Sequence, residues 1–516
     1  MTAANAPRPK GDVARSGREV FRRQVRSGFR RSLGLTALGT VIPGAGLTQT
    51  RSKRLGWAIL TLFLLSGVVV GFIVLRDGIT NAALSLVARP SLLQAAAVAF
   101  VVIGILWCGS IILTAIQTRP NRLDRTRTRT LAALTTVLVL LVAASTFKVA
   151  EYTLITTDTV RQVFSAGREL PDGQGAEIVE GDDPWAETPR VNVLMMGSDA
   201  GVGRIGTRTD SMIVASIDTR TGRTALISLP RNLEEAPLPA DSPLRKLYPS
   251  GVYGGPTCIR QQADPNDQCM LNAIWTEVDQ FRETNPGAFT GAVPGRDETR
   301  DVISEILGLK IDHTVVVDLA GFARLIDAMG GIDLNVKKSG FDTPLPKGGK
   351  VVNGRIVGVT GYFTPGFQHL GGNDALWYAR SRAADTDTFR QARQRCVVQA
   401  IVGQVNPGAM VSKYPEVARI AKDNIYTDIP VQNLPAYVDL IERVQRAPIT
   451  SVALTKIADY SSVHPDYDAI RALVKKAIAA PKPSATPSTT PATPKPGSTT
   501  TKPATPTPTA TPYEQC

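Results

Sequence analysis

The sequence NVLMMGSD at residues 192–199 is followed by GTRTDSMIVASID at 206–218 and by TALISLPRN at 224–232. Each segment contains a short apolar run rich in Val, Ile, Leu and Met, and each run is bounded by Gly, Asp or Pro. Short apolar runs with such boundaries are typical of buried strands. The stretch therefore predicts three neighbouring strands of an α/β sheet.

Charged residues stand at the ends of these expected strands. They are Asp199, Arg208, Asp210 and Arg231. In open α/β sheets, ligands bind outside the strand ends. Carboxylate oxygens suit Mg²⁺, and guanidinium groups form paired hydrogen bonds with phosphate oxygens. The pattern favours a site for a metal-bound phosphate, although an aspartate after a strand is also a common turn residue.

The remainder of residues 188–408 alternates between strand and helix patterns, which predicts a three-layer α/β/α sandwich with a central mixed sheet. Helices are expected at 298–307, 320–329, 373–380, 388–405 and 467–479, and further strands at 314–317 and 332–336. Gly330 and Gly331 are typical residues at the end of a helix. Residues 409–480 add helical patterns, so the domain is expected to span 188–480.

A second group of cations lies in the later part of this domain. It consists of Arg380, Arg382, Arg390 and Arg393, with Gln394 beside them. The last three share one face of an expected helix, at spacing i, i+3 and i+4. Such a run is often a solvated helix face. Here only Asp385 and Asp387 are close enough in sequence to neutralise it, which favours anion binding.

Six motifs between residues 192 and 394 resemble, in order, those of the LytR–CpsA–Psr family. They are NVLMMGSD (192–199), RTDS (208–211), SLPR (228–231), GLKIDH (308–313), YARSR (378–382) and FRQARQ (389–394). The resemblance implies a membrane-anchored phosphotransferase that moves a glycopolymer from a polyprenyl-pyrophosphate carrier to peptidoglycan. The implied partners are this lipid-linked donor, the peptidoglycan acceptor and membrane lipid. A side pyrophosphatase activity would be compatible with the same chemistry.

The resemblance also implies roles for individual residues. Asp199 and Asp210 would share one Mg²⁺, with Mn²⁺ as an alternative, and Arg208 and Arg231 would act beside them. The pyrophosphate ligands would be Arg208, Arg231, Arg380, Arg382, Arg390, Arg393 and Gln394. One departure concerns a lysine that the family commonly carries before a Leu/Ile-Asn-Ala sequence. Met270 stands there in this chain, and Lys246 is a candidate replacement.

The distribution of charge indicates a membrane anchor. Residues 1–150 contain 20 Lys and Arg against 4 Asp and Glu, whereas the remainder has a net charge of −3. This asymmetry argues against nucleic-acid binding by the globular part. Apolar segments at 57–75, 91–117 and 130–147 are long enough to cross a bilayer. A buried core helix is the alternative for any one of them, but three in succession with basic flanks favour transmembrane helices.

The basic flanks also predict orientation. Arginines in the arm 1–32 and in the loop 119–129 should remain cytoplasmic, which places residues after 150 outside the cell. Residues 33–50 are uncharged but rich in Gly, and we expect a re-entrant or interfacial segment within the anchor 33–150. Residues 151–187 look like a polar linker. Residues 481–516 are rich in Pro and Thr and are expected to be a disordered tail.

The five cysteines suggest one disulfide. Cys258 and Cys269 share a Gly- and Pro-rich loop, and a bond between them fits an oxidising compartment. Cys108 is expected to pack within a membrane helix, and Cys396 within the apolar face of the helix after Asp387. Cys516 is either a free thiol or an intermolecular partner.

Other chemistries fit less well. His313, His369 and His464 form no metal or triad pattern, and His313 is expected to be structural. Ser198 lies outside any G-x-S-x-G sequence, which argues against a serine hydrolase. A glycosidase using Asp199 and Asp210 is disfavoured, because neighbouring arginines lower the pKa that a general acid must keep high. A non-catalytic polyprenyl-pyrophosphate binder or regulator remains the main alternative.

Overall fold

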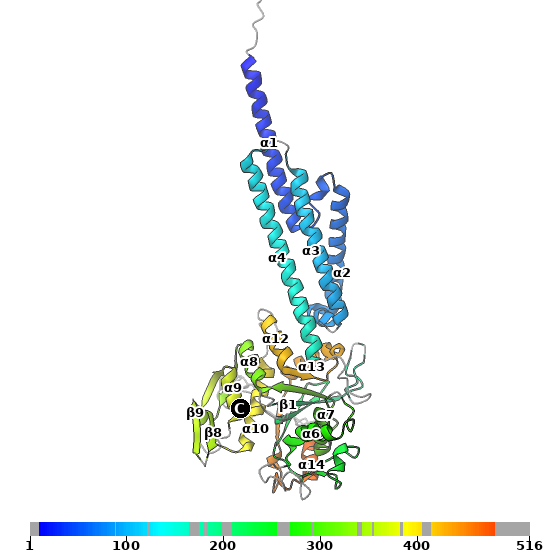
Figure 1. The fold of residues 1–516 in the computed structure, drawn as a ribbon, viewed down its shortest axis with the longest axis vertical. Coiled ribbons are helices and arrows are strands. Elements are labelled where there is room, and N and C mark those ends of the chain that lie inside the picture. The colour runs from blue at the N-terminus through cyan, green and yellow to red at the C-terminus, as the bar shows by residue number, and fades with distance from the viewer. Residues whose placement is uncertain are drawn as a thin grey trace, which may run out of the picture. The chain divides into compact units, whose positions relative to one another are not determined.

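The computed structural model describes residues 10–87, 89–120, 123–164, 175–179, 181, 183–198, 209–254, 269–291, 293–337, 343–352, 355–381, 385–404 and 414–479. The chain divides into two compact units, Met1–Asp158 and Thr159–Cys516. The first is helical, and the second combines a sheet with helices (Figure 1).

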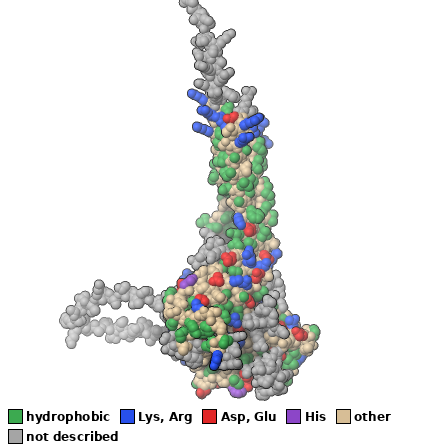
Figure 2. All heavy atoms as spheres, turned by 60° about the vertical axis from the view of Figure 1, so that its left-hand side comes forward, with side chains coloured by type: hydrophobic (Ala, Val, Ile, Leu, Met, Phe, Trp, Pro, Cys, Tyr) green, Lys and Arg blue, Asp and Glu red, His purple; other side chains and the backbone are tan. Residues whose placement is uncertain are grey.

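The first unit contains helices long and apolar enough to span a membrane. Its elements are α1 (Lys10–Val41), η1 (Leu47–Gln49), α2 (Lys53–Val87), α3 (Pro90–Thr118) and the greater part of α4 (Arg125–Val163). Among the described residues, three candidate spans lie at Lys53–Arg76, Ser91–Thr118 and Arg125–Val163. Figure 2 shows hydrophobic side chains over much of their surface. The three expected apolar segments are therefore helices with the length and apolar composition that a transmembrane helix needs.

The segment 33–50 is partly helical. Helix α1 continues through residue 32 to Val41. The boundary between a basic arm and the anchor stays a prediction. A turn and η1 follow, and Leu35 and Leu47 are buried. At Gly46 an added Cβ would lie 2.4 Å from the carbonyl oxygen of Leu35, so a side chain would not fit there. Insertion of this segment into the membrane stays a prediction.

A mixed six-stranded sheet forms the centre of the second unit, in the order β11-β6-β1-β2-β3-β12. The strands are β1 (Arg190–Ser198), β2 (Thr209–Asp218), β3 (Thr224–Leu229), β6 (His313–Asp318), β11 (Ile425–Thr427) and β12 (Ile449–Ala453). The pairs β1–β6 and β3–β12 are parallel, whereas β1–β2, β2–β3 and β11–β6 are antiparallel. The carboxyl ends of β1, β3, β6 and β12 consequently share one edge.

Helices cover both faces of this sheet. Leu194 and Met196 of β1 face a core shared with α6 (Ile274–Thr284), α7 (Pro294–Leu307) and α14 (Tyr467–Ile478). Val193 and Met195 point to the opposite face, which is covered by α13 (Leu434–Arg446) and α10 (Asp387–Gln404). The alternation of burial along the strand thus produces the predicted α/β/α sandwich.

A smaller layer packs beside α10. It contains α8 (Leu319–Met329), β7 (Ile332–Val336), the hairpin β8 (Leu345–Val352) and β9 (Arg355–Phe363), β10 (Gly366–Leu370) and α9 (Gly372–Arg380). Strand β7 was predicted as a strand but pairs with β10, outside the central sheet. The remaining elements described are β4 (Ala236–Pro237), η2 (Pro243–Lys246), β5 (Val252–Tyr253), η4 (Leu271–Ala273), α12 (Tyr414–Asn424), η5 (Val431–Asn433) and η6 (Leu454–Lys456).

Two described parts of the expected linker 151–187 are structured. Helix α4 continues to Val163, and Trp185 is buried against Tyr437 of α13, with ring centroids 5.1 Å apart. Thr188 also donates a hydrogen bond to the carbonyl oxygen of Glu177 at 2.7 Å. The large buried ring of Trp185 thus holds the residues beside it against the α/β unit.

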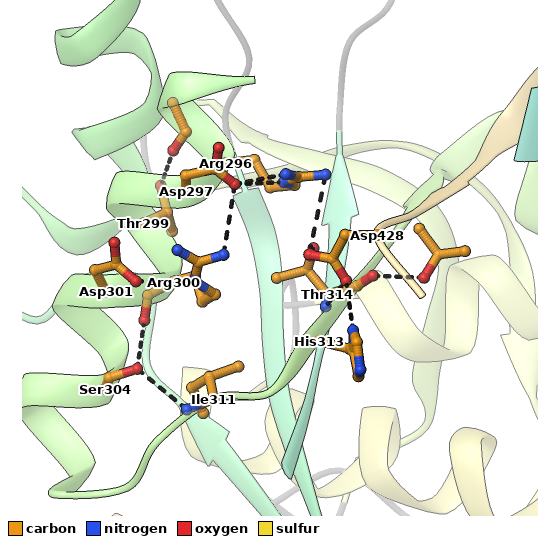
Figure 3. A network of polar contacts seen from close by, with 12 residues as sticks. Arg296, Asp297, Thr299, Arg300, Asp301, Ser304, Ile311, His313, Thr314 and Asp428 are labelled. Atoms are coloured by element: carbon orange, nitrogen blue, oxygen red, sulfur yellow. Dashed lines mark hydrogen bonds and ion pairs between the residues drawn. The ribbon is translucent and has the colours of Figure 1, made fainter. Parts of the chain in front are cut away.

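A buried polar network joins α7 to strands β6 and β11 (Figure 3). Arg296 lies 2.6 Å from Asp297 and 3.9 Å from Asp428, and His313 Nδ1 lies 3.3 Å from Asp428. The Ala176 N–H donates to His313 Nε2 at 3.2 Å, so the ring proton must lie on Nδ1 and point to Asp428. Burial of Asp428 opposes ionisation, but hydrogen bonds from His313 and Thr314 outweigh it and lower the pKa. His313 is structural, as expected.

The cysteines differ in part from the expectation. Cys269 and Cys396 are both disulfide-bonded, and Cys108 is free. The prediction that Cys396 simply packs in an apolar helix face is therefore wrong. Cys258, Cys516 and the tail 481–516 lie outside the described residues, so the predicted Cys258–Cys269 pairing stays a prediction.

Candidate functional site

The candidate site lies at the sheet edge where β1 and β3 end and β2 begins. Gly197 pairs with Ser211, but Ser198 pairs with Thr209, so Asp210 is the extra residue of a β-bulge. An added Cβ at Gly197 would come 2.3 Å from Ser211 Oγ, which explains glycine at this close approach of two strands. Bulges redirect side chains and are common beside functional sites. Here the bulge redirects a carboxylate.

Two arginines from distant parts of the chain approach the Asp210 carboxylate. Arg231, just beyond β3, donates from Nη1 to Asp210 Oδ1 at 2.8 Å. Arg380, the last residue of α9, has Nη2 3.7 Å from Asp210 Oδ2. All three side chains are only partly buried. One carboxylate thus holds two guanidinium groups at an accessible edge, and the group carries a net positive charge suited to an anion.

The first turn of α10 contributes a further arginine. Arg390 is almost fully buried, and its Nη2 lies 2.7 Å from Asp387 Oδ1, one turn earlier on the helix. Gln394, one turn further along, is also buried. The predicted helix and the positions of these residues are confirmed. Their contact with a phosphate is not tested by the geometry and stays a prediction.

Arg393 makes several contacts within the protein. Its Nε donates to the carbonyl oxygen of Tyr378 at 2.7 Å, Nη1 pairs with Asp385, and Nη2 donates to the carbonyl oxygen of Ser381. Its guanidinium also lies 5.8 Å from the centroid of the Tyr378 ring. Nearly all donors are used internally, so the geometry makes Arg393 a clamp between α9 and α10. Its predicted contact with a phosphate stays a prediction.

The segment that departs from the family motif lies next to Arg231. The backbone N–H of Asn272 donates to the carbonyl oxygen of Arg231 at 3.1 Å, and that of Leu271 donates to Leu233 at 2.8 Å. Asn272 is buried, whereas Lys246 is exposed on η2. Among the described residues, no ion pair joins Lys246 to Asp210. Its suggested role as a replacement cation therefore gains no support.

A loop that the sequence did not indicate packs against the same edge. Ser462, between β12 and α14, accepts a hydrogen bond from Asn232 Nδ2 at 3.0 Å. Burial, together with the negative charge of Asp387, raises the pKa of nearby Tyr460 to about 12. Among the described residues, the non-glycine residues with positive φ are Glu235 (53°) and Asp459 (54°), and they lie in these two adjoining segments. Strained backbone of this kind often accompanies a functional site.

Three predicted site residues, Asp199, Arg208 and Arg382, lie outside the described residues. The predicted sharing of a metal between Asp199 and Asp210 cannot therefore be read from the geometry. Within the described part of the chain, no group of three or more His, Cys, Asp or Glu residues could hold a metal ion. Asp210 Oδ2 forms no hydrogen bond to a described residue, although it lies 3.7 Å from Arg380 Nη2.

The fold and the site define a class: an α/β protein with a helical, membrane-compatible unit and an arginine-rich cluster at a sheet edge. The model of the LytR_cpsA_psr family matches residues 168–476, which is more than half of the chain. The protein belongs to this family.

Two similar proteins carry transferase names. The chain is 25% identical over 301 residues to the polyisoprenyl-teichoic acid–peptidoglycan teichoic acid transferase TagU of Oceanobacillus iheyensis, covering 58% of this chain and 76% of TagU. It is 27% identical over 244 residues to TagV of Bacillus subtilis, which has the corresponding name, covering 46% of this chain and half of TagV.

Solved structures of the family are also similar. The crystal structure of B. subtilis TagV aligns with 23% identity and a TM-score of 0.36, over 56% of this chain and 95% of TagV. The LytR-CPS2A-psr family protein YwtF (TagT) with bound octaprenyl pyrophosphate lipid aligns with 16% identity and a TM-score of 0.35, over 60% of this chain and 97% of that one.

Proposed function

We propose that this protein is a membrane-anchored phosphotransferase that moves a glycopolymer from a polyprenyl-pyrophosphate carrier to peptidoglycan. The observation that carries the proposal is the Asp210 carboxylate on its bulge, flanked by Arg231 at 2.8 Å and Arg380 at 3.7 Å. Family membership and the names of the transferase relatives support the same activity. The polymer and the acceptor hydroxyl are left open.

The chemistry follows from the charges at the site. A hydroxyl oxygen of the acceptor attacks the phosphorus joined to the glycan, the bond from that phosphorus to the bridging oxygen breaks, and polyprenyl phosphate leaves. The hydroxyl proton is released to water. Arg231 and Arg380 offer forked donors to the phosphate oxygens, and Arg390 adds charge from α10. Such contacts lower the barrier where they tighten as charge develops on the leaving phosphate.

A divalent cation fits the donors of the site. Asp210 would hold it through Oδ2, which lies 3.7 Å from Arg380 Nη2, whereas Oδ1 accepts a hydrogen bond from Arg231. Asp199, which follows the last residue of β1 in the sequence, is the proposed second ligand. When bound, Mg²⁺ or Mn²⁺ would supply further positive charge to the pyrophosphate oxygens. The arginines described above then bind and orient the same phosphates.

The helical unit supports action at a membrane. A lipid carrier remains in the bilayer, so an enzyme that uses it must be held there. The spans α2, α3 and α4 meet the length requirement. The excess of Lys and Arg over Asp and Glu in residues 1–150 supports an orientation with the α/β unit outside the cell, where peptidoglycan lies.

Non-catalytic binding of a polyprenyl pyrophosphate is the alternative, because an arginine cluster can bind pyrophosphate without turnover. The two functions are separated by supplying the full-length protein, in detergent, with a polyprenyl-pyrophosphate-linked glycan and peptidoglycan. The proposal requires release of polyprenyl phosphate and appearance of glycan on the peptidoglycan. Tight binding of the donor without either product would reject the transferase and support the binder.

A further inference from the structure

Arg395 is a buried arginine with too few partners. It lies on α10 with 4% of its surface exposed, and its Nε donates to Ser451 Oγ of β12. Among the described residues this is its only hydrogen bond, and Nη1 is sealed from solvent without an acceptor. No carboxylate in the described part of the chain forms an ion pair with it.

Arg393, two residues earlier on the same helix, shows how this protein otherwise buries a guanidinium. Arg393 uses the carboxylate of Asp385 and two backbone carbonyl oxygens. Both arginines are more than nine-tenths buried. One is neutralised by a carboxylate, whereas the other faces a single hydroxyl. Arg395 is therefore not explained by the packing that explains Arg393.

Burial of an unpaired cation is unfavourable unless an anion or several acceptors compensate it. Burial lowers the pKa of Arg395 to about 10, with no charged neighbour opposing the change. The side chain is consequently still charged at neutral pH. A buried arginine that stays charged without a carboxylate partner is expected where a bound ligand supplies the missing negative charge.

The position differs from that of the Asp210 cluster. Arg395 is five residues beyond Arg390, which corresponds to roughly 7.5 Å along the helix and about 140° around it. Ser451 lies on β12, an outer strand of the sheet, and is exposed. Ala453, two residues further along β12, pairs with Ser228 on the strand that leads to Arg231. An anion at Arg395 and Ser451 would therefore be a second ligand near the first.

We propose that Arg395 and Ser451 form a second oxyanion-binding site, which takes a phosphate or carboxylate group of the polymer while the pyrophosphate lies at Asp210, Arg231 and Arg380. Binding of an oxyanion follows from the unpaired guanidinium alone. Its assignment to the polymer rests on the proposed function and would make Arg395 a determinant of selectivity for anionic glycans over neutral ones.

The first test uses inorganic phosphate and the full-length protein in detergent, followed by titration calorimetry. We expect two classes of site in the unaltered protein. Arg395→Met and Ser451→Ala should each weaken one class, Arg395→Met by tenfold or more, because a charge-assisted contact is lost. Arg231→Gln should weaken the other class. Arg446→Met is the matched control, because Arg446 is a mostly exposed arginine paired only with Glu442.

Unchanged phosphate binding in both Arg395→Met and Ser451→Ala would overturn the proposal. If Arg395→Met does not fold, Ser451→Ala decides, since it removes one hydroxyl from an exposed position. Arg395→Lys keeps the charge without the fork and should retain part of the affinity. The unliganded Arg395→Met protein should also melt at a higher temperature than the parent, and phosphate should stabilise it less.

The second test concerns the polymer. With lipid-linked donors that differ only in the charge of the glycan, Arg395→Met should raise KM about tenfold for the anionic donor and leave the neutral donor unchanged. An equal effect on both donors would reject the assignment to the polymer. If no variant turns over any donor, the transferase fails, while the phosphate titration still decides whether the second site exists.

Discussion

Arg231 donates a hydrogen bond to Asp210 across two neighbouring antiparallel strands, at 2.8 Å, and the acceptor is the extra residue of a β-bulge. This pair holds the guanidinium in place before any substrate arrives. An arriving phosphate must compete with the carboxylate for the same donors or share them. The position of the Arg231 guanidinium therefore depends on the negative charge of Asp210.

Replacing Asp210 by Asn should reduce activity more than it reduces donor binding. The amide keeps the shape of the side chain but loses the charge that holds Arg231 and Arg380 and that would hold a cation. We expect turnover to fall by about a hundredfold or more, or ~2.7 kcal/mol in the barrier. The measurement is release of polyprenyl phosphate. Asp468→Asn, an exposed residue of α14, is the control, and equal turnover in the two variants would contradict the prediction.

Replacing Arg231 by Lys should not restore the function lost in Arg231→Gln. Lysine supplies charge but lacks the planar fork that can contact Asp210 and a phosphate together. We expect a loss of about 1.5–3 kcal/mol in transition-state binding for Arg231→Gln, and most of this loss for the lysine variant. Values of kcat/KM for the three proteins provide the measurement. Full activity of Arg231→Lys would show that charge alone suffices.

Substitution of Arg393 should act on stability first. Arg393→Met leaves the Asp385 carboxylate buried without a partner, which typically costs about 3–5 kcal/mol. We expect a clear decrease in the melting temperature and a displaced Arg380. Thermal denaturation of the full-length protein in detergent measures the loss. Replacement of the exposed Arg446 by Met is the control, and a melting temperature equal to that of this control would contradict the clamp.

Glu298 should make stability depend on pH. Burial is the main cause that raises the pKa of Glu298 to about 7, although a hydrogen bond from Ser242 opposes it. A carboxyl group whose pKa is higher in the folded than in the unfolded state destabilises the fold as pH rises from about 4.5 to about 7. Glu298→Gln should remove a loss of about 3 kcal/mol over this range. Melting curves at pH 5 and pH 8 test this, with the exposed Glu305→Gln on the same helix as control.

The membrane orientation can be tested with a reporter fused after Ala479. A reporter that is active only outside the cytoplasm should give signal, because the arginines of the loop 119–129 should stay inside. A reporter that is active only in the cytoplasm should give none. The opposite pattern would place the site away from peptidoglycan and would reject the proposed acceptor.

Local sequence signals predicted the elements well. Helix α8 is one example, because Asp318 caps its first turn through hydrogen bonds from Ala320 and Gly321, and Gly330 ends it with a φ of 99°. These are short-range effects that the amino-acid pattern contains. The strand boundaries at Asp210 and Arg231 were also predicted from the local sequence. The bulge itself depends on how two strands pair, and a single strand does not contain that information.

Longer-range relationships could not be predicted. The strand pattern of β7 does not say that its partner is β10 rather than the central sheet. The spacing of Arg390, Arg393 and Gln394 places them on one helix face. Only the packing of α9 shows that the donors of Arg393 bind Asp385 and two backbone carbonyl groups. The sequence around Trp185 and Tyr460 did not indicate the burial of these side chains, because that burial depends on segments distant in sequence.

The order of strands in the sheet has a consequence for how the chain reaches this fold. Strands β1, β2 and β3 are consecutive and antiparallel, so they can pair early and with short loops. The parallel partners β6 and β12 begin only at His313 and Ile449, and they must close much longer loops. Arg380 and Arg390 lie between β6 and β12 in the sequence, so they reach the site only when these longer loops have closed. A newly made chain should therefore form the β1–β3 meander before the candidate site is complete. During that interval its unpaired strand edges would need protection from aggregation.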